Sequence, residues 1–161
     1  MNEDVYPRYA LPAEGGCRCG GLRFRITGQP MMTSACHCAG CQRMTGAPFS
    51  TTLIVPADGF EVTKGQTQLG GLRGPDLHHH HCPDCLSWVF TRVAGVDAIV
   101  NVRAVLLDDG RGFVPFIETC TSEKLPWVAT PAEHSFETMP PVEVYQDLLA
   151  DYAAHLSPEE D

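Results

Sequence analysis

Seven of the eight cysteines fall into three tight clusters whose spacing predicts metal ligation. Thiolates two or three residues apart can converge on one ion, and two such pairs make a closed tetrahedral site. A group of three thiolates leaves a fourth coordination position open, so a closed site indicates a structural role and an open one indicates chemistry. The clusters are Cys17-x-Cys19, Cys36-x-Cys38-x-x-Cys41 and Cys82-x-x-Cys85.

The competing interpretation of clustered cysteines is a disulfide framework, which small domains use in oxidising compartments. Residues 1–16 contain no basic region followed by an apolar run, so we expect no secretory leader and a cytoplasmic, reducing location. At 161 residues with 43% apolar composition, the chain can bury an ordinary core without crosslinks. Residues two apart, such as Cys17 and Cys19, also seldom bridge each other without strain. Metal binding is therefore the favoured interpretation.

The charge balance argues against a nucleic-acid partner. The chain has 11 Lys and Arg against 20 Asp and Glu, a formal net charge of −9, whereas nucleic-acid binding depends on clustered basic residues that neutralise phosphates. The sequence contains no basic run and no C2H2 zinc-finger spacing. No apolar stretch approaches the roughly 18 residues of a membrane span. We expect one acidic, soluble domain over residues 1–161.

The alternating Leu22, Phe24 and Ile26 show the period-two pattern of a half-buried strand. Other segments are rich in β-branched and aromatic residues and are separated by turn signals, so they are also predicted to be strands. The predicted fold is mainly β and antiparallel. After Pro140-Pro141 apolar residues recur at helical spacing and predict a short amphipathic helix over 143–157, packed on the sheet or on a second subunit, so a homodimer stays open. The other predicted strands are 51–55, 60–63, 88–93, 98–107 and 113–118.

The cysteine clusters and their neighbours resemble one enzyme family. In chain order the matching segments are Gly16-Cys17-Arg18-Cys19-Gly20, Cys36-His37-Cys38-Ala39-Gly40-Cys41-Gln42-Arg43, Cys82-Pro83-Asp84-Cys85 and Lys124-Leu125-Pro126-Trp127. This series resembles the glutathione-dependent formaldehyde-activating enzymes over residues 12–142. The resemblance implies an Mss4-like zinc-binding folded β sheet or sandwich. It also implies two zinc ions, a structural one on Cys17, Cys19, Cys82 and Cys85 and a catalytic one on Cys36, Cys38 and Cys41.

The charge of a three-thiolate site limits its chemistry. Three thiolates on Zn2+ leave a net charge of about −1, so the ion is a weak Lewis acid and a poor source of hydroxide. Such a soft site suits a fourth thiol, which it deprotonates and presents as a nucleophile. The resemblance implies that this thiol is glutathione and that the electrophile is formaldehyde, giving S-hydroxymethylglutathione. Because the reverse step breaks a carbon–sulfur bond, the implied enzyme is a carbon–sulfur lyase.

Three residues are predicted to contact the substrate. Glutathione has two carboxylates, and Arg43, two residues after Cys41, is the first candidate to bind one, the alternative being a solvated loop arginine. Lys124 and Trp127 are candidates because their segment matches the family, the alternative for Trp127 being a core position. His37 lies between two ligand cysteines, and we expect it to tune the site indirectly or to be exposed rather than to bind metal.

Three features have no settled role in this interpretation. The internal run His78–His81 would present alternate histidines to opposite faces of a strand, so two could point towards a cleft. Leu86 stands where the family's last cysteine pair is usually followed by glycine, so the turn is expected to relax or to strain. Cys120 belongs to no cluster and is expected to be a buried, inert thiol.

Two other functions stay open. A reactive Cys120 would suit a methionine sulfoxide reductase of the B type, whose zinc lies in a similar fold, although the three-cysteine cluster does not belong to that type. A non-catalytic module in which zinc staples a small sheet that binds glutathione or a protein is the second alternative, because fold alone does not define function.

Overall fold

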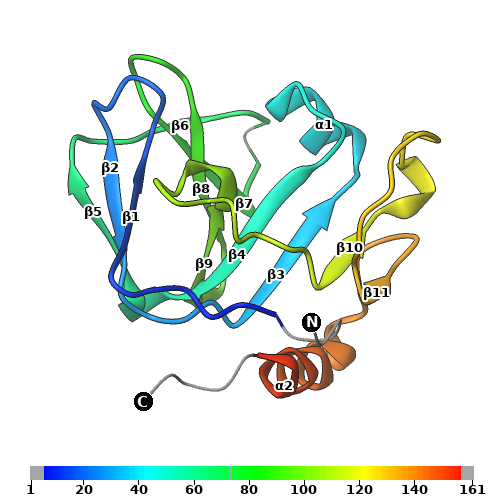
Figure 1. Ribbon diagram of the computed structural model, residues 1–161. Coiled ribbons are helices and arrows are strands. Elements are labelled where there is room, and N and C mark those ends of the chain that lie inside the picture. Colours follow the sequence, from blue (N-terminus) through cyan, green and yellow to red (C-terminus); the bar gives the residue numbers. More distant parts are fainter. Residues whose placement is uncertain (1–5, 73, 157–161) are drawn as a thin grey trace.

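Two β-sheets and a C-terminal helix make up the part of the chain that the computed structural model describes, residues 6–72 and 74–156 (Figure 1). The eleven strands within these residues are β1 (Ala13–Gly16), β2 (Arg23–Ile26), β3 (Met32–Cys36), β4 (Ser50–Pro56), β5 (Phe60–Lys64), β6 (Gln68–Gly70), β7 (Leu77–His81), β8 (Trp88–Val93), β9 (Val96–Arg103), β10 (Ile117–Thr119) and β11 (His134–Ser135). The helices are α1 (Ala39–Thr45), α2 (Tyr145–His155) and the short 3-10 helices η1 (Ala57–Gly59), η2 (Ala104–Leu106), η3 (Thr121–Glu123) and η4 (Val142–Val144).

The small sheet has the order β1-β2-β5 and the large sheet has the order β11-β10-β3-β4-β9-β8-β7-β6. Side chains from both sheets meet in one core: the ring of Phe24 lies 5.7 Å from that of Phe60, which in turn lies 4.9 Å from Phe90 of the large sheet. Burying one such side chain stabilises the fold by about 1.5–3 kcal/mol. Cys17 and Cys82 belong to the same core cluster, so the packing of the sandwich also places two of the cysteines.

The C-terminal helix packs on the large sheet. Leu148 and Tyr152 of α2 are buried in a second core cluster with Met32 of β3 and Phe116, and the rings of Tyr152 and Phe116 lie 5.2 Å apart. The predicted helix over 143–157 is thus confirmed as Tyr145–His155, with residue 157 outside the described residues. Because the buried face of α2 is already covered by its own sheet, it is not the surface on which a homodimer would depend.

Three details differ from the predicted β pattern. The strand predicted over 98–107 ends at Arg103, after which Ala104–Leu106 form η2. Segment 113–118 forms only the short strand β10, because Pro115 interrupts it with a residue that has no N–H for a ladder hydrogen bond. β10 also pairs in parallel with both β3 and β11, so the antiparallel pairing predicted for the bulk of the domain does not extend to this edge. The parallel register matters for function because it brings the segment after β10 beside the end of β3.

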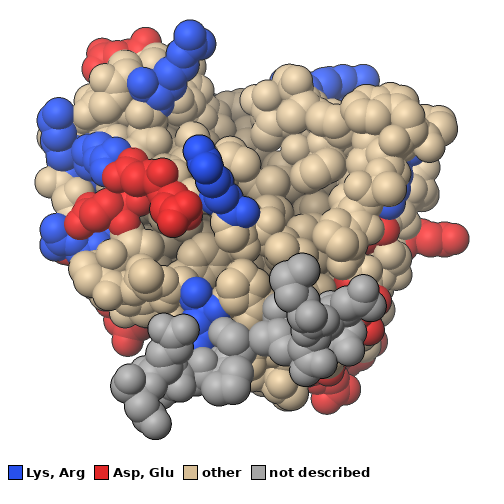
Figure 2. Space-filling model, viewed as in Figure 1, with Lys and Arg blue, Asp and Glu red and all other residues tan. Residues whose placement is uncertain are grey.

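Charged side chains on the face shown in Figure 2 gather over β1, β2 and β5, where basic and acidic groups are interleaved. Arg25 Nε bonds Glu14 Oε1 at 2.6 Å and its Nη1 bonds Glu61 Oε1 at 3.1 Å, while Arg23 forms an ion pair with Asp108. The charges of this patch offset one another, so the patch is not the continuous basic surface that nucleic acid requires.

Leu86 takes a backbone conformation that usually belongs to glycine. Its φ is 60°, in the left-handed region, and its N–H donates to the Cys82 carbonyl at 3.0 Å, which closes the turn. The turn therefore strains rather than relaxes, at a cost of roughly 1–2 kcal/mol for a residue with a Cβ. The side chain is 62% exposed, so little packing offsets this cost.

Replacing Leu86 by glycine is expected to stabilise the zinc-loaded protein by about 0.5–1 kcal/mol, the relief of strain less the larger unfolded-state entropy of glycine. Urea denaturation at fixed zinc concentration measures the change. Leu86→Ala is the matched control, since alanine removes the side chain and keeps the Cβ. An equal effect of alanine and glycine would contradict the strain argument.

Candidate metal centres

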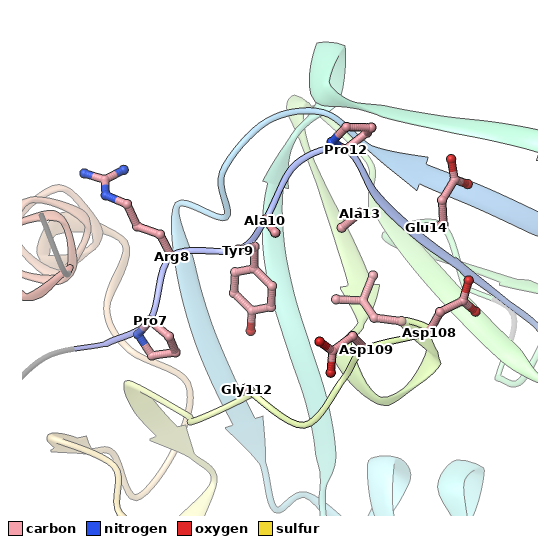
Figure 3. A pocket seen from close by; sticks show the side chains of 11 residues that line it. Pro7, Arg8, Tyr9, Ala10, Pro12, Ala13, Glu14, Asp108, Asp109 and Gly112 are labelled. Carbon is pink, nitrogen blue, oxygen red and sulfur yellow. The ribbon is translucent and has the colours of Figure 1, made fainter. Parts of the chain in front are cut away.

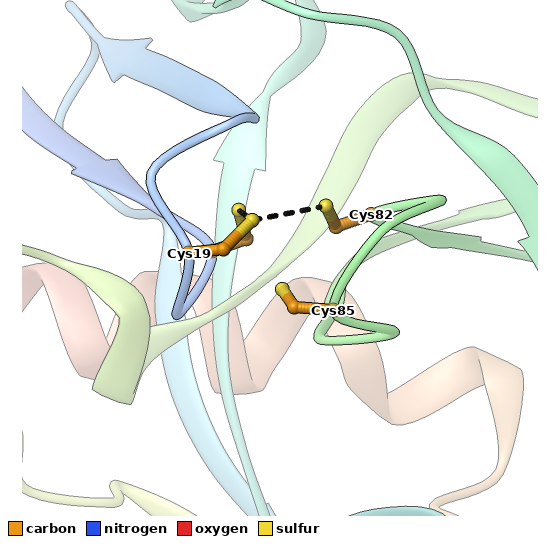
Figure 4. A group of neighbouring side chains, drawn as sticks. Cys19, Cys82 and Cys85 are labelled. Atoms are coloured by element: carbon orange, nitrogen blue, oxygen red, sulfur yellow. Dashed lines mark hydrogen bonds between the residues drawn. The ribbon is translucent and has the colours of Figure 1, made fainter.

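Two loops that are distant in sequence bring four thiols together (Figure 4). Cys17 and Cys19 come from the β1–β2 loop, and Cys82 and Cys85 come from the β7–β8 loop. The four sulfur atoms lie within 4.8 Å of one another, and Cys19 Sγ is 3.5 Å from Cys17 Sγ and 3.8 Å from Cys82 Sγ. In a tetrahedron with Zn–S bonds of about 2.3 Å, neighbouring sulfurs are about 3.8 Å apart. The four thiols therefore fit a closed zinc site.

Nearby donors support this first cluster. The Leu22 N–H donates to Cys17 Sγ at 3.2 Å, and the Ser87 hydroxyl lies 3.2 Å from Cys85 Sγ while accepting the Arg18 N–H at 3.2 Å. The hydrogen bond from Arg18 to Ser87 joins the two loops directly. Such outer contacts orient ligand side chains and favour the thiolate form.

The second cluster is formed where β3 passes into α1. Cys36 ends the strand, Cys38 caps the helix and Cys41 lies in its first turn, with the three sulfurs within 4.8 Å of one another. The Cys41 N–H donates to Cys38 Sγ at 3.3 Å, so one side chain both starts the helix and belongs to the cluster. Among residues 6–72 and 74–156, no fourth Cys, His, Asp or Glu completes the group, and all three cysteines are half-buried. The group fits a metal site with one position open.

Cys120 lies next to the second cluster without joining it. It directly follows Thr119, whose partner across the parallel pairing is Cys36, and it is half-buried rather than buried. Burial, and then the negative charge of Cys36, raises the pKa of the Cys120 thiol to about 12. A thiol with so high a pKa is a poor nucleophile, which favours the inert interpretation of Cys120 over a reductase role.

A buried carboxylate supports the second cluster from the neighbouring strand. Glu118 of β10 has a side chain that is 8% exposed, and it accepts four hydrogen bonds. The donors are Ser135 Oγ at 2.6 Å, Thr130 Oγ1 at 2.7 Å, Lys124 Nζ at 2.8 Å and His37 Nε2 at 3.0 Å. Burial alone would raise the pKa of Glu118, but these hydrogen bonds outweigh it and lower the pKa to about 2. The group is therefore an anion at neutral pH.

The Glu118 carboxylate contacts two residues that were singled out from the sequence, His37 and Lys124. His37 is fully buried, and because an ionised carboxylate can only accept, its Nε2–H donates to Glu118. This bond fixes His37 between Cys36 and Cys38. As predicted, His37 does not belong to the group of thiols, and its burial shows that the alternative of an exposed side chain is wrong. Lys124 directs its ammonium to the same carboxylate, so its substrate role stays a prediction beside a structural role that the sequence did not indicate.

Arg43 and Trp127, the other two predicted substrate residues, line one groove of about 430 Å³. Arg43 is exposed on α1, and Trp127 is 73% exposed, so the core alternative for this Trp is wrong. Gln42 also lines the groove and donates from Nε2 to the His37 carbonyl at 2.6 Å. Gln42 thus links the groove to the turn that carries the second cluster, although none of the three thiols lines the groove.

The run His78–His81 lies in β7, and buried histidines alternate with more exposed ones, as on any strand with one face in the core. His79 and His81 are buried while His78 is exposed, and His80 stacks on Phe90 at 4.3 Å. Burial is the main cause that holds the pKa values of His79, His80 and His81 below their usual range. These three histidines are therefore neutral packing residues at neutral pH, and within the described residues they form no metal-binding group.

A second hollow, of about 360 Å³, lies between the N-terminal segment and the turn after η2 (Figure 3). None of its lining residues is a cysteine. Two of its three acidic side chains are neutralised, Glu14 by Arg25 and Asp108 by Arg23. This hollow therefore lacks the chemistry of the cysteine clusters.

Comparison with known proteins agrees with this geometry. The sequence model of the glutathione-dependent formaldehyde-activating enzyme family matches residues 12–123, well over half of the chain. The chain belongs to this family. A Halomonas elongata protein that bears the family's name is 34% identical over 87 residues, which cover 48% of this chain and 55% of that one. The chain thus spans about half the length of this relative.

The crystal structure of a Rhodobacter sphaeroides protein has a fold similar to that of this chain. Its TM-score is 0.53 at 18% sequence identity, and the match covers 66% of this chain and 99% of that one. Both predicted cysteine groups of the family motif are assembled by the fold. Among the described residues, no helix has the length and apolar character to cross a bilayer.

Glu118→Gln is expected to lower the free energy of unfolding at pH 7 by about 2–3 kcal/mol, because the amide loses the charge that its four donors stabilise. The depressed pKa of Glu118 means that its contribution is complete above about pH 4.5 and is lost as the pH falls towards about 2. The gap between wild type and variant should therefore close over this range in urea denaturation.

The exposed Glu123→Gln serves as the control and should differ little from wild type at any of these pH values. A gap between wild type and Glu118→Gln that stays constant down to pH 2 would show that the carboxylate charge is not what stabilises this region.

Proposed function

We propose that this protein is a zinc-dependent carbon–sulfur lyase that forms or cleaves S-hydroxymethylglutathione or a closely related thiol adduct. The observation that carries the proposal is the half-buried group of Cys36, Cys38 and Cys41, which has no fourth partner among the described residues. Gln42, the residue after Cys41, lines the nearby groove. Membership of the glutathione-dependent formaldehyde-activating enzyme family supports glutathione and formaldehyde as the substrates.

Two unequal metal sites follow from this proposal. Cys17, Cys19, Cys82 and Cys85 would hold a structural zinc that joins the β1–β2 and β7–β8 loops. A zinc held by Cys36, Cys38 and Cys41 would supply a soft Lewis acid that favours the thiolate form of an incoming thiol. Eight free cysteines and a thiol substrate both suit a reducing compartment, so we propose a cytoplasmic location.

The residues around the groove would bind and orient the substrate. Arg43 offers a planar guanidinium to a glutathione carboxylate, and the exposed ring of Trp127 provides an apolar wall on the opposite lining segment. Lys124 would act at this site chiefly by holding Glu118, and Glu118 would act by holding His37. The turn with the three thiols then keeps its geometry while substrates exchange.

The reaction needs no redox partner. The glutathione sulfur attacks the carbonyl carbon of formaldehyde, a carbon–sulfur bond forms, and the π electrons of the carbonyl move to oxygen. The proton lost by the thiol is returned to that oxygen, so thiol and aldehyde give S-hydroxymethylglutathione with no other product. Holding the sulfur and the aldehyde next to each other in the correct orientation would accelerate this step over the reaction in water.

Loss of a cysteine should have different effects in the two clusters. Cys17→Ser is expected to lower stability by several kcal/mol, because zinc binding at a structural site contributes on the order of 10 kcal/mol to folding. Cys38→Ser should stay folded, bind one zinc fewer and lose catalysis of S-hydroxymethylglutathione formation, as measured by NMR exchange above the spontaneous rate. The division into structural and catalytic sites is wrong if both variants simply unfold.

Arg43→Gln is expected to raise KM for glutathione by about tenfold, the effect of losing one charge-assisted hydrogen bond, and to leave folding unchanged. Arg43→Lys should be intermediate because it keeps the charge and loses the planar geometry. The exposed Arg111→Gln, outside the groove, is the matched control. A wild-type protein that binds glutathione without accelerating exchange would identify a binding module instead of an enzyme.

A further inference from the structure

Arg103, at the end of β9, is a buried arginine without a carboxylate partner among the described residues. It is 6% exposed, and its guanidinium carbon lies 4.1 Å from the centre of the Trp88 ring. Its Nη2 makes one long bond to the Asn101 carbonyl, at 3.4 Å, and its Nε has no hydrogen-bond partner. A buried charge costs several kcal/mol unless it is compensated, and the Trp88 ring and one long hydrogen bond offset only part of that cost, so a nearby anion would stabilise Arg103.

The pairing of the strands places Arg103 on the same face of the large sheet as the second cysteine cluster. Arg103 pairs with Thr52 of β4, and two residues along that strand Ser50 pairs with Cys36. Paired residues, and residues two apart on a strand, share a face of the sheet. Arg103 and Cys36 therefore lie on one face, with only β4 between their strands.

The electrostatics of this region agree with the geometry. Burial lowers the pKa of Arg103 to about 10, and the negative charges of Cys41 and Cys36 act against that decrease. Arg103 is therefore a cation at neutral pH. Its neighbour His79 is neutral, because burial, followed by the charge of Arg103, lowers the pKa of the imidazole. On the sheet face that they share with Arg103, the thiols of the second cluster are the groups whose negative charge, once they bind a metal, would offset that of the guanidinium.

We propose that Arg103 is the counter-charge of the three-thiolate site and makes that site select an anionic fourth ligand, a thiolate, over a neutral one. Zn2+ with three thiolates has a net charge of about −1, and a fourth thiolate brings it to about −2. A fixed guanidinium in a dry, low-dielectric region offsets one of these charges before the ligand arrives. Arg103 thereby acts on the fourth ligand through the charge of the site and need not touch it.

This inference rests on the proposed function only in treating Cys36, Cys38 and Cys41 as a metal site with an exchangeable position. The test uses protein with cobalt(II) in that site, titrated separately with 2-mercaptoethanol, a thiol without carboxylates, and with imidazole, a neutral ligand. Changes in the visible cobalt spectrum report the binding of each ligand. Neither glutathione nor formaldehyde is present, so failure of this test and failure of the proposed reaction are distinguishable.

In Arg103→Met the affinity for 2-mercaptoethanol should fall by between about 10- and 100-fold, while the affinity for imidazole stays within about twofold of wild type. Arg103→Lys keeps the charge and should retain the preference for the thiol. Arg92→Met, on the adjacent strand β8, removes an arginine that the inference does not use and should change neither affinity.

An equal loss of both ligands in Arg103→Met would overturn the inference and show that Arg103 merely supports the fold of the site. Unchanged thiol affinity would overturn it as well. If Arg103→Met does not fold, Arg103→Lys decides the matter: a folded lysine variant that prefers imidazole contradicts the charge effect, and one that keeps the wild-type ligand preference supports it.

Discussion

The mutual repulsion of clustered thiolates is the constraint on which this structure depends. Sulfur atoms held within 4.8 Å of one another cannot all ionise unless a cation lies among them, and residues 6–72 and 74–156 contain two thiol groups of this kind. The four-thiol group joins loops from both sheets, so its metal would complete the sandwich. The three-thiol group lies where one strand passes into one helix, so its metal would depend on a pre-formed turn.

Oppositely charged residues lie on the strands near the three-thiol group, an anion on β10 and a cation on β9. Glu118 is an anion that fixes His37 and Lys124, and Arg103 is a cation on the sheet face that carries Cys36. The charge of Glu118 is stabilised by its own four donors, whereas thiolates at the second group would supply the opposite charge that Arg103 lacks. A site built in this way can keep its shape while its fourth ligand exchanges, which is what addition and removal of a thiol substrate require.

Local spacing was enough to predict the group of Cys36, Cys38 and Cys41, since residues two or three apart must lie close whatever the fold, whereas the joining of Cys17 and Cys19 with Cys82 and Cys85 was implied by the family resemblance. The β-branched and aromatic residues of 88–93 predicted β8, and the helical periodicity of 143–157 predicted α2. Glu118 and Arg103 could not be found in this way, because their partners lie on other strands. The only signals were single charges at buried strand ends. The parallel pairing of β10 depends on a crossover that periodicity does not encode.

The central claim is that one metal site is closed and the other is open to thiols. Native mass spectrometry of the reduced protein, with and without glutathione and a mild chelator, tests it most directly. The account predicts two zinc ions per chain, one resistant to the chelator and one that the chelator removes unless glutathione is present. A single tightly held zinc that glutathione does not affect would contradict the open site and leave only the structural one.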